Sequence, residues 1–515
     1  MMKVLICFFG ILFTSLACRA ELPRVLILGD TVYREVFSGG KELVQGRVQI
    51  EYPTLPDGEV FHSGNLLEKF DQLLGDKKWD LIHFNVGLGD LIHRAPGMKS
   101  FRVLPRYAGG VRTTSPRDYE KNLRAIVKRL KKTGAKLIWG TTTPIRSNPS
   151  DLFEMGSEVK YNEIAAKVMS EEKVTSNDMY SFVVELIDMA KPASHGADPF
   201  SFDRKPIFPP VIRSILRELG LLKPIKGPLK VFLMVGGTTV FGGGTVSDLQ
   251  KPREGAPAGS LAHLVRNPAT QKQFAHLVNE DGSWASRSDV WVQFNQRASK
   301  SGALGIGYGG PGYARGIGPE LGLGHVLGDR FEEQVLILKI DLGKPSVAVD
   351  LRSPGAGTAG RSYSALIKQI QDSTRAFENK FPDFLEGSKY EFAGAILDLG
   401  ENDKDAKAFE KQLSVLITDL RKELQVSNLP VVILGLGQGG MSETQFSTIL
   451  EAQRRVALLP DLRKSLRFVD TRKFWPPENE RNSYRKPTFE GWYQHAGSFY
   501  AIGETAGNAM LEMME

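Results

Sequence analysis

Short runs of branched apolar residues alternate with amphipathic segments along most of the chain. The runs have the length of buried strands, and the segments between them repeat apolar residues every three or four positions, as helices do. Strands that alternate with helices are typical of parallel sheets wrapped by helices, so the pattern predicts an α/β fold. We expect strands near residues 24–29, 47–52, 80–85 and 136–140, a second series that starts at residue 230 and continues near 334–340, 392–399, 430–436 and 467–469, and helices near 116–133, 157–172, 210–219 and 499–514.

A stretch that carries proline and glycine, residues 221–229, separates the two series of strands. A chain of 515 residues is too long for a single core. We therefore predict two domains, residues 21–220 and 230–515, joined by this linker and each folding around its own core. Residues 246–318 are polar and rich in glycine, and we expect an irregular insertion there that shapes a site rather than core.

The first 20 residues have the pattern of a secretory signal peptide. A basic residue precedes an apolar run, and small residues follow as far as Ala20. Cleavage after Ala20 would release a soluble, secreted or periplasmic chain that starts at Glu21. The alternative is a lipoprotein anchored through an acylated Cys18, although Ser15 stands where a lipobox usually has leucine.

Charge and cysteine content narrow the classes of partner. Both cysteines, Cys7 and Cys18, lie in the leader, so we expect no disulfide, cysteine nucleophile or cysteine-ligated metal in the mature chain. The formal net charge of +7 falls to about +5 without the leader. The basic cluster at residues 128–132 lies on a predicted helix and is interpreted as a solvated face. We therefore predict no nucleic-acid partner, and no membrane contact unless Cys18 is lipidated.

Two predicted strands end in a turn where an esterase would hold its nucleophilic serine, at the carboxyl end of a sheet. The residue at that position is threonine in both turns, and the repetition indicates two related domains. The turns are Gly29-Asp30-Thr31 and Gly236-Gly237-Thr238.

Segments of the first domain resemble the sequence blocks of SGNH (GDSL-type) hydrolases over about residues 22–220. The resemblance implies a flavodoxin-like three-layer fold with a parallel sheet. It places Thr31 at the nucleophile, and it makes Asp30 and Gly64 candidate ligand-binding positions. The matching segments are residues 29–32, 62–65, 79–91 and 136–144.

The catalytic residues of that family are replaced in this domain. A serine esterase needs a nucleophile, a histidine that takes its proton, and donors that face the oxyanion. The family takes its histidine from an Asp-x-x-His motif, but here Asp198 is followed by Ser201 at the histidine position. Gly89 stands where an oxyanion-hole asparagine is common, and His195 is interpreted as a surface-loop residue. We expect the Thr31 hydroxyl to cap the following turn rather than to attack an ester.

From about residue 227 to the C-terminus the chain resembles the sialate O-acetylesterase-like carbohydrate esterases, another SGNH branch. The resemblance places Thr238 at the nucleophile, Gly237 where the family has glutamine and Thr239 where it has asparagine. The catalytic histidine of the family would fall near Gly491, and His495 stands where the family has an asparagine. The implied ligand-binding positions are Gly237, Thr239, Gly400, Glu401, Asn402 and Trp492, and the matching segments are residues 230–242, 318–325, 339–343, 399–403 and 474–475.

The glycine-rich turn of the second domain is not typical of a nucleotide site. Residues 237–242 have the first half of a Walker spacing, but Gly243 and Gly244 follow where lysine and serine or threonine are required. The dinucleotide fingerprint is also missing. We therefore predict no nucleotide and no cofactor.

Acidic residues and tryptophans could line the same sheet edge in the second domain. The acids could hold a hard cation or form an acid/base pair, although acids that set solvated turns are the favoured interpretation and no metal is predicted. The tryptophans could stack on sugars, but each is more often a core residue. The acids are Asp341, Asp398, Glu401 and Asp403, and the tryptophans are Trp284, Trp291, Trp475 and Trp492.

These observations lead to three hypotheses about function. The favoured one is a secreted pair of SGNH-like domains that has lost catalysis and binds carbohydrate, such as an acetylated glycan, or serves as a scaffold. The second is an active carbohydrate esterase that uses Thr238 with a base such as His495. The third is a structural interaction protein whose two domains pack face to face.

Overall fold

The computed structural model describes residues 21–515 except residues 41–42, 45, 56–58, 99–100, 193–199, 201, 203–204, 248–257, 296–299, 311–315, 376 and 482–491. The predicted signal peptide lies outside the described residues, as do His195, Asp198, Ser201 and Gly491. Within the described part of the chain, no helix is long and apolar enough to cross a membrane.

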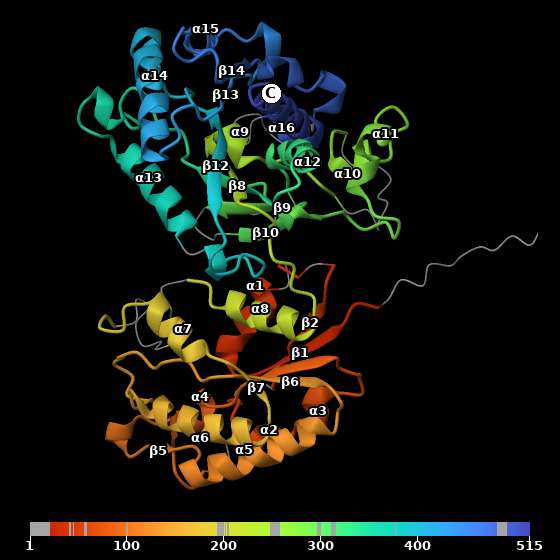
Figure 1. Ribbon diagram of the computed structural model, residues 1–515, viewed down its shortest axis with the longest axis vertical. Coiled ribbons are helices and arrows are strands. Elements are labelled where there is room, and N and C mark those ends of the chain that lie inside the picture. The colour runs from red at the N-terminus through yellow and green to blue at the C-terminus, as the bar shows by residue number, and fades with distance from the viewer. Residues whose placement is uncertain are drawn as a thin grey trace, which may run out of the picture.

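A five-stranded parallel sheet organises the first part of the chain, in the order β2-β1-β3-β6-β7 (Figure 1). Numbered along the chain, this is the flavodoxin-like order 2-1-3-4-5 that the sequence predicts. Strand β1 is buried from Val25 to Leu28 because helices cover both faces of the sheet. The strands are β1 (Arg24–Leu28), β2 (Gln49–Glu51), β3 (Leu81–Phe84), β6 (Lys136–Gly140) and β7 (Thr175–Asn177).

Helices α1 and α8 lie on the face of this sheet that is turned toward the second sheet, and α5 and α6 lie on the other face (Figure 1). Helix α5 starts where its sequence requires, because Ser115 accepts a hydrogen bond from the N–H of Asp118 and Pro116 fills the first helical position. The helices are α1 (Arg34–Gly40), α2 (Ser63–Glu68), α3 (Phe70–Leu74), α4 (Leu88–Leu91), α5 (Pro116–Lys131), α6 (Ser157–Glu171), α7 (Met179–Leu186) and α8 (Phe208–Glu218).

A seven-stranded sheet organises the second part, in the order β10-β9-β11-β8-β12-β13-β14. All neighbours pair in parallel except β10 with β9. Without β9 and β10 the order is again 2-1-3-4-5, so both sheets share one plan and the predicted α/β class is confirmed. The strands are β8 (Leu229–Gly236), β9 (Arg287–Asn295), β10 (Lys300–Leu304), β11 (Val335–Asp341), β12 (Tyr390–Asp398), β13 (Val431–Leu434) and β14 (Leu466–Val469).

Alternate residues of β8 enter two separate layers of core. Val231 and Leu233 join the apolar cluster that contains residues of α13 and α14, while Phe232 and Met234 join the cluster that contains residues of α12 and α16. The result is a sheet between two helical layers. The helices are α9 (Thr238–Phe241), α10 (Leu261–Leu264), α11 (Gln271–Phe274), α12 (Glu320–Arg330), α13 (Arg361–Thr374), α14 (Ala406–Glu423), α15 (Ser447–Ala457) and α16 (Ala496–Leu511).

The prediction that residues 246–318 contribute no core is wrong. Strand β9 lies inside the sheet between β10 and β11, and Val290, Val292 and Phe294 are buried on one of its faces. Trp291 is buried on the other face, where its ring stacks on Phe381 at 4.3 Å between centroids. Glycine-rich flanks and polar residues at both ends of β9 hide its alternating pattern in the sequence.

The second sheet contacts the first part of the chain through the edge at which its strands begin. Asp383, which precedes β12, accepts hydrogen bonds from Arg47 Nη1 at 3.0 and 2.8 Å and from the N–H of Lys223 at 2.9 Å. Arg213 on α8 donates to the carbonyl oxygen of Pro382 at 3.1 Å. Buried apolar residues form one continuous cluster from the first sheet to one face of the second. The contact between the two parts of the chain therefore consists of an ion pair and a continuous apolar layer.

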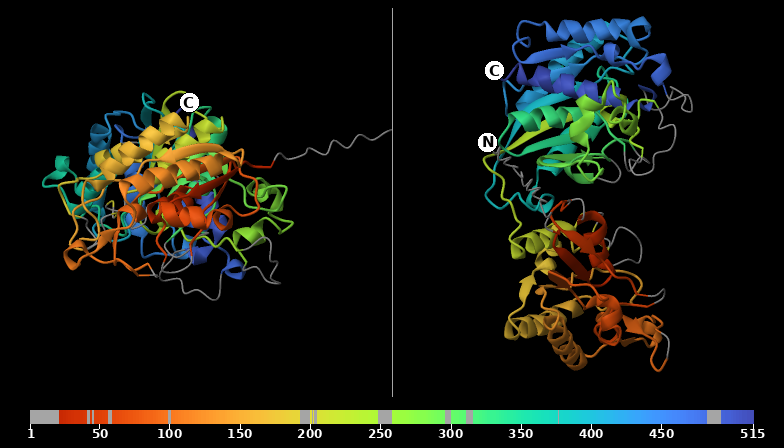
Figure 2. Two further views of the ribbon diagram at one scale, coloured as in Figure 1. Left: turned by 90° about the horizontal axis from the view of Figure 1, so that it is seen from below. Right: turned by 90° about the vertical axis from the view of Figure 1, so that its right-hand side faces the viewer.

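This contact keeps the two candidate sites apart. Strand β12 points away from the first sheet, so its carboxyl end at Asp398 lies far from Asp383 (Figures 1 and 2). Leu229, placed in the linker from the sequence, is the first residue of β8. The separate folding of the two halves stays a prediction.

Replacing Asp383 with alanine is expected to loosen the linker. The change removes the acceptor of Arg47 Nη1 and of the Lys223 amide, and each lost hydrogen bond to a charged group is worth about 1.5–3 kcal/mol. Limited proteolysis should cut residues 221–228 faster than in the wild type. Asp461→Ala, at an exposed position, is the matched control. Equal cleavage rates for the wild type and Asp383→Ala would show that apolar packing alone holds the linker.

Candidate functional site

Three neighbouring strands of the second sheet end at the same level. Gly236 at the end of β8 is aligned with Asp341 at the end of β11 and with Asp398 at the end of β12. The loops that follow these strands therefore meet at one sheet edge, where open α/β folds bind ligands. Thr238 begins α9 directly after the β8 turn.

The hydroxyl of Thr238 donates to a carboxylate rather than to a histidine. Its Oγ1 lies 3.0 Å from Glu401 Oε2, and Lys344 Nζ lies 2.7 Å from the same oxygen. Gln438 Nε2 donates to the other oxygen of Glu401 at 3.1 Å. No histidine of the described residues forms a hydrogen bond with Thr238. Lys344 and Gln438 carry no signal in the sequence, because the loop positions that bring them to Glu401 depend on the folded sheet.

Asp398 supports the turn that presents Thr238. Its Oδ2 accepts hydrogen bonds from the N–H groups of Thr239 at 2.9 Å and Val240 at 3.2 Å. Burial raises the pKa of Asp398 to about 7, and the nearby negative charge of Glu401 acts in the same direction. This carboxyl group therefore anchors the backbone of the turn, and its pKa lies close to neutral pH.

At two positions where the resemblance implies a polar side chain, the facing backbone leaves no room for one. A Cβ on Gly237, which stands at the family's glutamine, would lie 2.4 Å from the carbonyl oxygen of Gly343. A Cβ on Gly89 in the first domain would lie 1.9 Å from the carbonyl oxygen of Phe61. No side chain fits at either position unless the facing backbone moves, so neither position supplies a side-chain donor to an oxyanion.

His495, the candidate base, has another role. It caps α16, since its Nδ1 accepts the N–H of Ser498 at 2.9 Å, and its Nε2 lies 3.0 Å from Glu480 Oε2. Burial lowers its pKa, although Glu480 opposes this shift. Both ring nitrogens are therefore engaged away from Thr238.

Trp492 lies in the core and not on the surface of the site. Its indole is fully buried and its Nε1–H lies 3.4 Å from Thr239 Oγ1. Trp492, Tyr493 and Gln494 have φ angles of 66°, 49° and 57°, three consecutive left-handed residues without a glycine. Trp475 is half-buried beside Trp492 and Tyr493, so it is the tryptophan that remains partly open next to the site.

The remaining loop residues set turns. Gly400 has a φ of 124°, a conformation that favours glycine. Asn402 Nδ2 donates to the carbonyl oxygen of Lys344 at 2.5 Å. Asp403 accepts the N–H groups of Val347 and Ala348 at 2.8 and 3.0 Å. In the part of the chain that the structure describes, no group of three acidic, histidine or cysteine side chains could hold a metal ion, so the cation hypothesis gains no support.

A buried ion pair beneath the turn was missed by sequence analysis. Lys339 on β11 and Glu320 on α12 are both fully buried, with 2.8 Å between Nζ and Oε2. Lys339 Nζ also donates to the carbonyl oxygens of Phe241 at 3.1 Å and Tyr308 at 2.5 Å. Glu320 Oε1 accepts the N–H of Gly318 at 2.7 Å. In the sequence, the one sign of this ion pair was a lysine inside an apolar strand.

In the first domain, Asp30 rather than Thr31 caps the turn. Asp30 Oδ1 accepts the N–H of Val32 at 3.1 Å, and Thr31 is exposed as the first residue of the turn. The prediction of a Thr31 cap is wrong because the capping side chain must precede the first helical residue. Burial raises the pKa of Asp30 to about 7. Gly64 lies in α2, where its N–H donates to His62 Nδ1 at 3.1 Å.

Comparison with known protein families finds a match in the second part of the chain. Residues 228–474 match the family model described as carbohydrate esterase, sialic acid-specific acetylesterase. No curated protein was found that matches the sequence.

Several solved structures are similar to parts of the chain. A protein from Arabidopsis thaliana is 16% identical, with 55% of this chain and 98% of that chain covered and a TM-score of 0.35. A carbohydrate acetylesterase from Xanthomonas citri is 13% identical, with 54% and 55% covered and a TM-score of 0.30. An acetylxylan esterase from Geobacillus stearothermophilus is 16% identical, with 38% and 94% covered and a TM-score of 0.28.

Replacing Asp398 with asparagine should change the pH dependence of stability. The folded protein holds this proton up to about pH 7, whereas the ordinary pKa is 3.8, so the wild type loses stability as pH rises through this interval. Asparagine keeps an oxygen for both amides and does not titrate. The difference in melting temperature between Asp398→Asn and the wild type should therefore increase by at least about 2–4 °C from pH 4 to pH 7. Above pH 7 this difference should stay constant. Thermal melts across this pH range test the prediction, with Asp461→Asn as control. Parallel plots of melting temperature against pH for the wild type and Asp398→Asn would contradict it.

Replacing Lys339 with methionine should destabilise the second domain strongly. Removal of one partner from a buried pair leaves an uncompensated charge and costs about 3–5 kcal/mol. The double variant Lys339→Met with Glu320→Gln should recover part of the loss, because no buried charge remains. Chemical denaturation measures both, and the exposed Lys368→Met is the control. A loss below about 1 kcal/mol for the single variant would refute the role given to this pair.

Proposed function

We propose, from the premise that residues 228–474 are a carbohydrate esterase domain of the sialic acid-specific acetylesterase family, that this protein binds acetylated carbohydrate without hydrolysing it. One observation carries the proposal. The hydroxyl at the nucleophile position, Thr238, donates to Glu401 where an esterase requires a histidine. The protein acts as a binding module or scaffold.

The chemistry of this contact explains the loss of catalysis. A hydroxyl becomes a nucleophile when a neighbouring base takes its proton, and an effective base has a pKa near the working pH. The carboxylate of Glu401 is paired with Lys344 and accepts two further hydrogen bonds, so both of its oxygens are already engaged by neighbouring side chains. The methyl group of Thr238 also restricts its rotamers and crowds the path of attack.

The same edge retains features that suit ligand binding. Thr238 is partly exposed, Asn402 is exposed and Trp475 is partly open. These side chains offer hydrogen-bonding groups and an aromatic ring at the carboxyl end of the sheet, which is the usual combination for a sugar. Acetylated carbohydrate is the substrate class that the family suggests. The first domain, with Thr31 exposed and Asp30 used as a cap, serves as a scaffold.

A second candidate function is an active esterase. The 3.0 Å hydrogen bond from Thr238 to Glu401 favours this carboxylate over His495 as the group that would take the proton. The acetate-release assay in the next paragraph distinguishes this active esterase from the binding module.

Neither the wild type nor Thr238→Ser should release acetate from an aryl acetate or an O-acetylated oligosaccharide. Serine restores the nucleophile but not the histidine, and members of a catalytic triad act as a unit. Calorimetry should show binding of the same oligosaccharide, weakened by Trp475→Ala and unchanged by Trp284→Ala. Turnover by the wild type that is lost in Thr238→Val and kept in Thr31→Val would refute the proposal. Glu401→Gln and His495→Ala would then identify the base.

A further inference from the structure

A small flap projects from the carboxyl edge of the first sheet between α4 and α5. We define the flap as residues 93–98 and 101–112; it contains β4 (His93–Arg94), β5 (Val111–Arg112) and the short helix η2 (Arg106–Ala108). Arg94 is paired with Val111 on one side and with Val103 on the other, both antiparallel. The flap is therefore a two-stranded ribbon extended by one isolated bridge, and it has two distinct faces.

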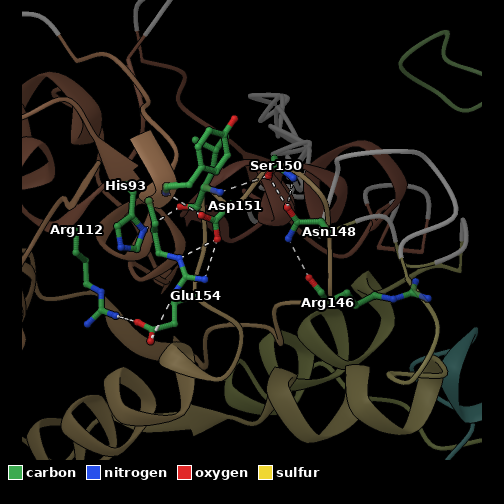
Figure 3. A network of polar contacts seen from close by, with 10 residues as sticks. His93, Arg112, Arg146, Asn148, Ser150, Asp151 and Glu154 are labelled. Atoms are coloured by element: carbon green, nitrogen blue, oxygen red, sulfur yellow. Dashed lines mark hydrogen bonds and ion pairs between the residues drawn. The ribbon is translucent and has the colours of Figure 1, made fainter. Parts of the chain in front are cut away.

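The inner face of the flap is tied to residues 150–154. Successive strand residues point to opposite faces, so His93 and its partner Arg112 share this side. His93 is buried with Nδ1 3.0 Å from the carbonyl oxygen of Leu152, and Arg112 forms an ion pair with Glu154 (Figure 3). Arg106 Nε donates to Asp151 at 2.9 Å. These contacts fix the ribbon and determine which face it presents outward.

The outer face is apolar and exposed. Val103 and Val111, which flank Arg94, are 42% and 45% exposed. Tyr107 in η2 is 80% exposed and Met98 is 42% exposed. The flap therefore supplies four of the eleven large apolar side chains that are exposed in the described residues, and such a concentration marks an interaction surface.

The charge around this face has one sign. Residues 91–117 contain six lysines and arginines and no aspartate or glutamate. Asp151 and Glu154 neutralise Arg106 and Arg112 on the inner side. Arg94, which shares the side of Val103 and Val111, forms no ion pair with any residue that the structure describes. The outer face thus combines aliphatic side chains with an arginine that has no acidic partner among the described residues, and the flap adds the exposed ring of Tyr107.

We propose that the outer face of the flap docks on the surface of a membrane that contains anionic lipid. Aliphatic side chains gain by entering the boundary between headgroups and acyl chains, a tyrosine places its ring there with its hydroxyl in water, and arginines attract anionic headgroups. A sugar polymer would instead require hydrogen-bonding groups, which Val103, Val111 and Met98 do not offer. This docking is independent of Cys18.

Co-sedimentation with lipid vesicles tests the proposal. The chain from Glu21 is used, because it retains every described residue and lacks the apolar leader. It should bind vesicles of phosphatidylcholine with phosphatidylglycerol, bind pure phosphatidylcholine vesicles weakly, and be released by salt. Tyr107→Ser with Val111→Ser should lower the affinity about five-fold or more, and Arg94→Gln about five-fold. Val349→Ser, at a position 58% exposed in the second domain, should bind like the wild type.

A fluorescent label on the flap gives a readout that does not depend on a loss of vesicle binding. The chain from Glu21 has no cysteine, so Tyr107→Cys can carry a single environment-sensitive label. Its emission should shift to the blue with phosphatidylglycerol vesicles and stay unchanged with phosphatidylcholine alone. The proposal is overturned if the wild type does not bind anionic vesicles or if the flap variants bind like the wild type. Binding to soluble heparin but not to vesicles, with the same dependence on Tyr107 and Val111, would also overturn it and assign the face to a soluble polyanion.

Discussion

The buried pair of Lys339 and Glu320 is the interaction on which the second site depends. An ammonium group without solvent must be surrounded by acceptors, and here it gathers a carboxylate with the carbonyl oxygens of Phe241 and Tyr308. Those partners come from α12, from the end of α9 and from the inserted segment. One cation therefore fixes the last residue of the turn helix and the glycine-rich loop against β11, and the position of Thr238 follows from that arrangement.

Carboxylates at the sheet edges hold the loops in place. Asp398 and Asp403 each accept two backbone N–H groups from loops distant in the sequence. Asp30 accepts one backbone N–H locally in the first domain, and Asp383 accepts one between the two parts of the chain. A charged acceptor makes a stronger bond than a neutral one, so these acids fix loops that lack regular structure. Glu401 differs, since its partners are the side chains of Thr238, Lys344 and Gln438.

The elements that depend on local pattern were predictable from the sequence. The apolar strands β1, β3, β6 and β8 and the turn at Gly236 all lie where branched residues and glycine indicate. Strand β9 was not predictable, because its place in the sheet depends on pairing with β11 and on a partner ring at Phe381. The contact of Arg47 with Asp383 joins residues 336 positions apart and has no local signal. The resemblance located Thr238 and Glu401, but only the fold shows that they are partners.

The backbone opposite Gly89 and Gly237 restricts which substitutions can add a side chain at either position. A glutamine at position 237 would collide with the Gly343 carbonyl, and an asparagine at position 89 with that of Phe61. Such a side chain becomes available only together with a movement of the facing loop. Engineering a polar group at either position is therefore a problem of loop redesign and not of single substitution.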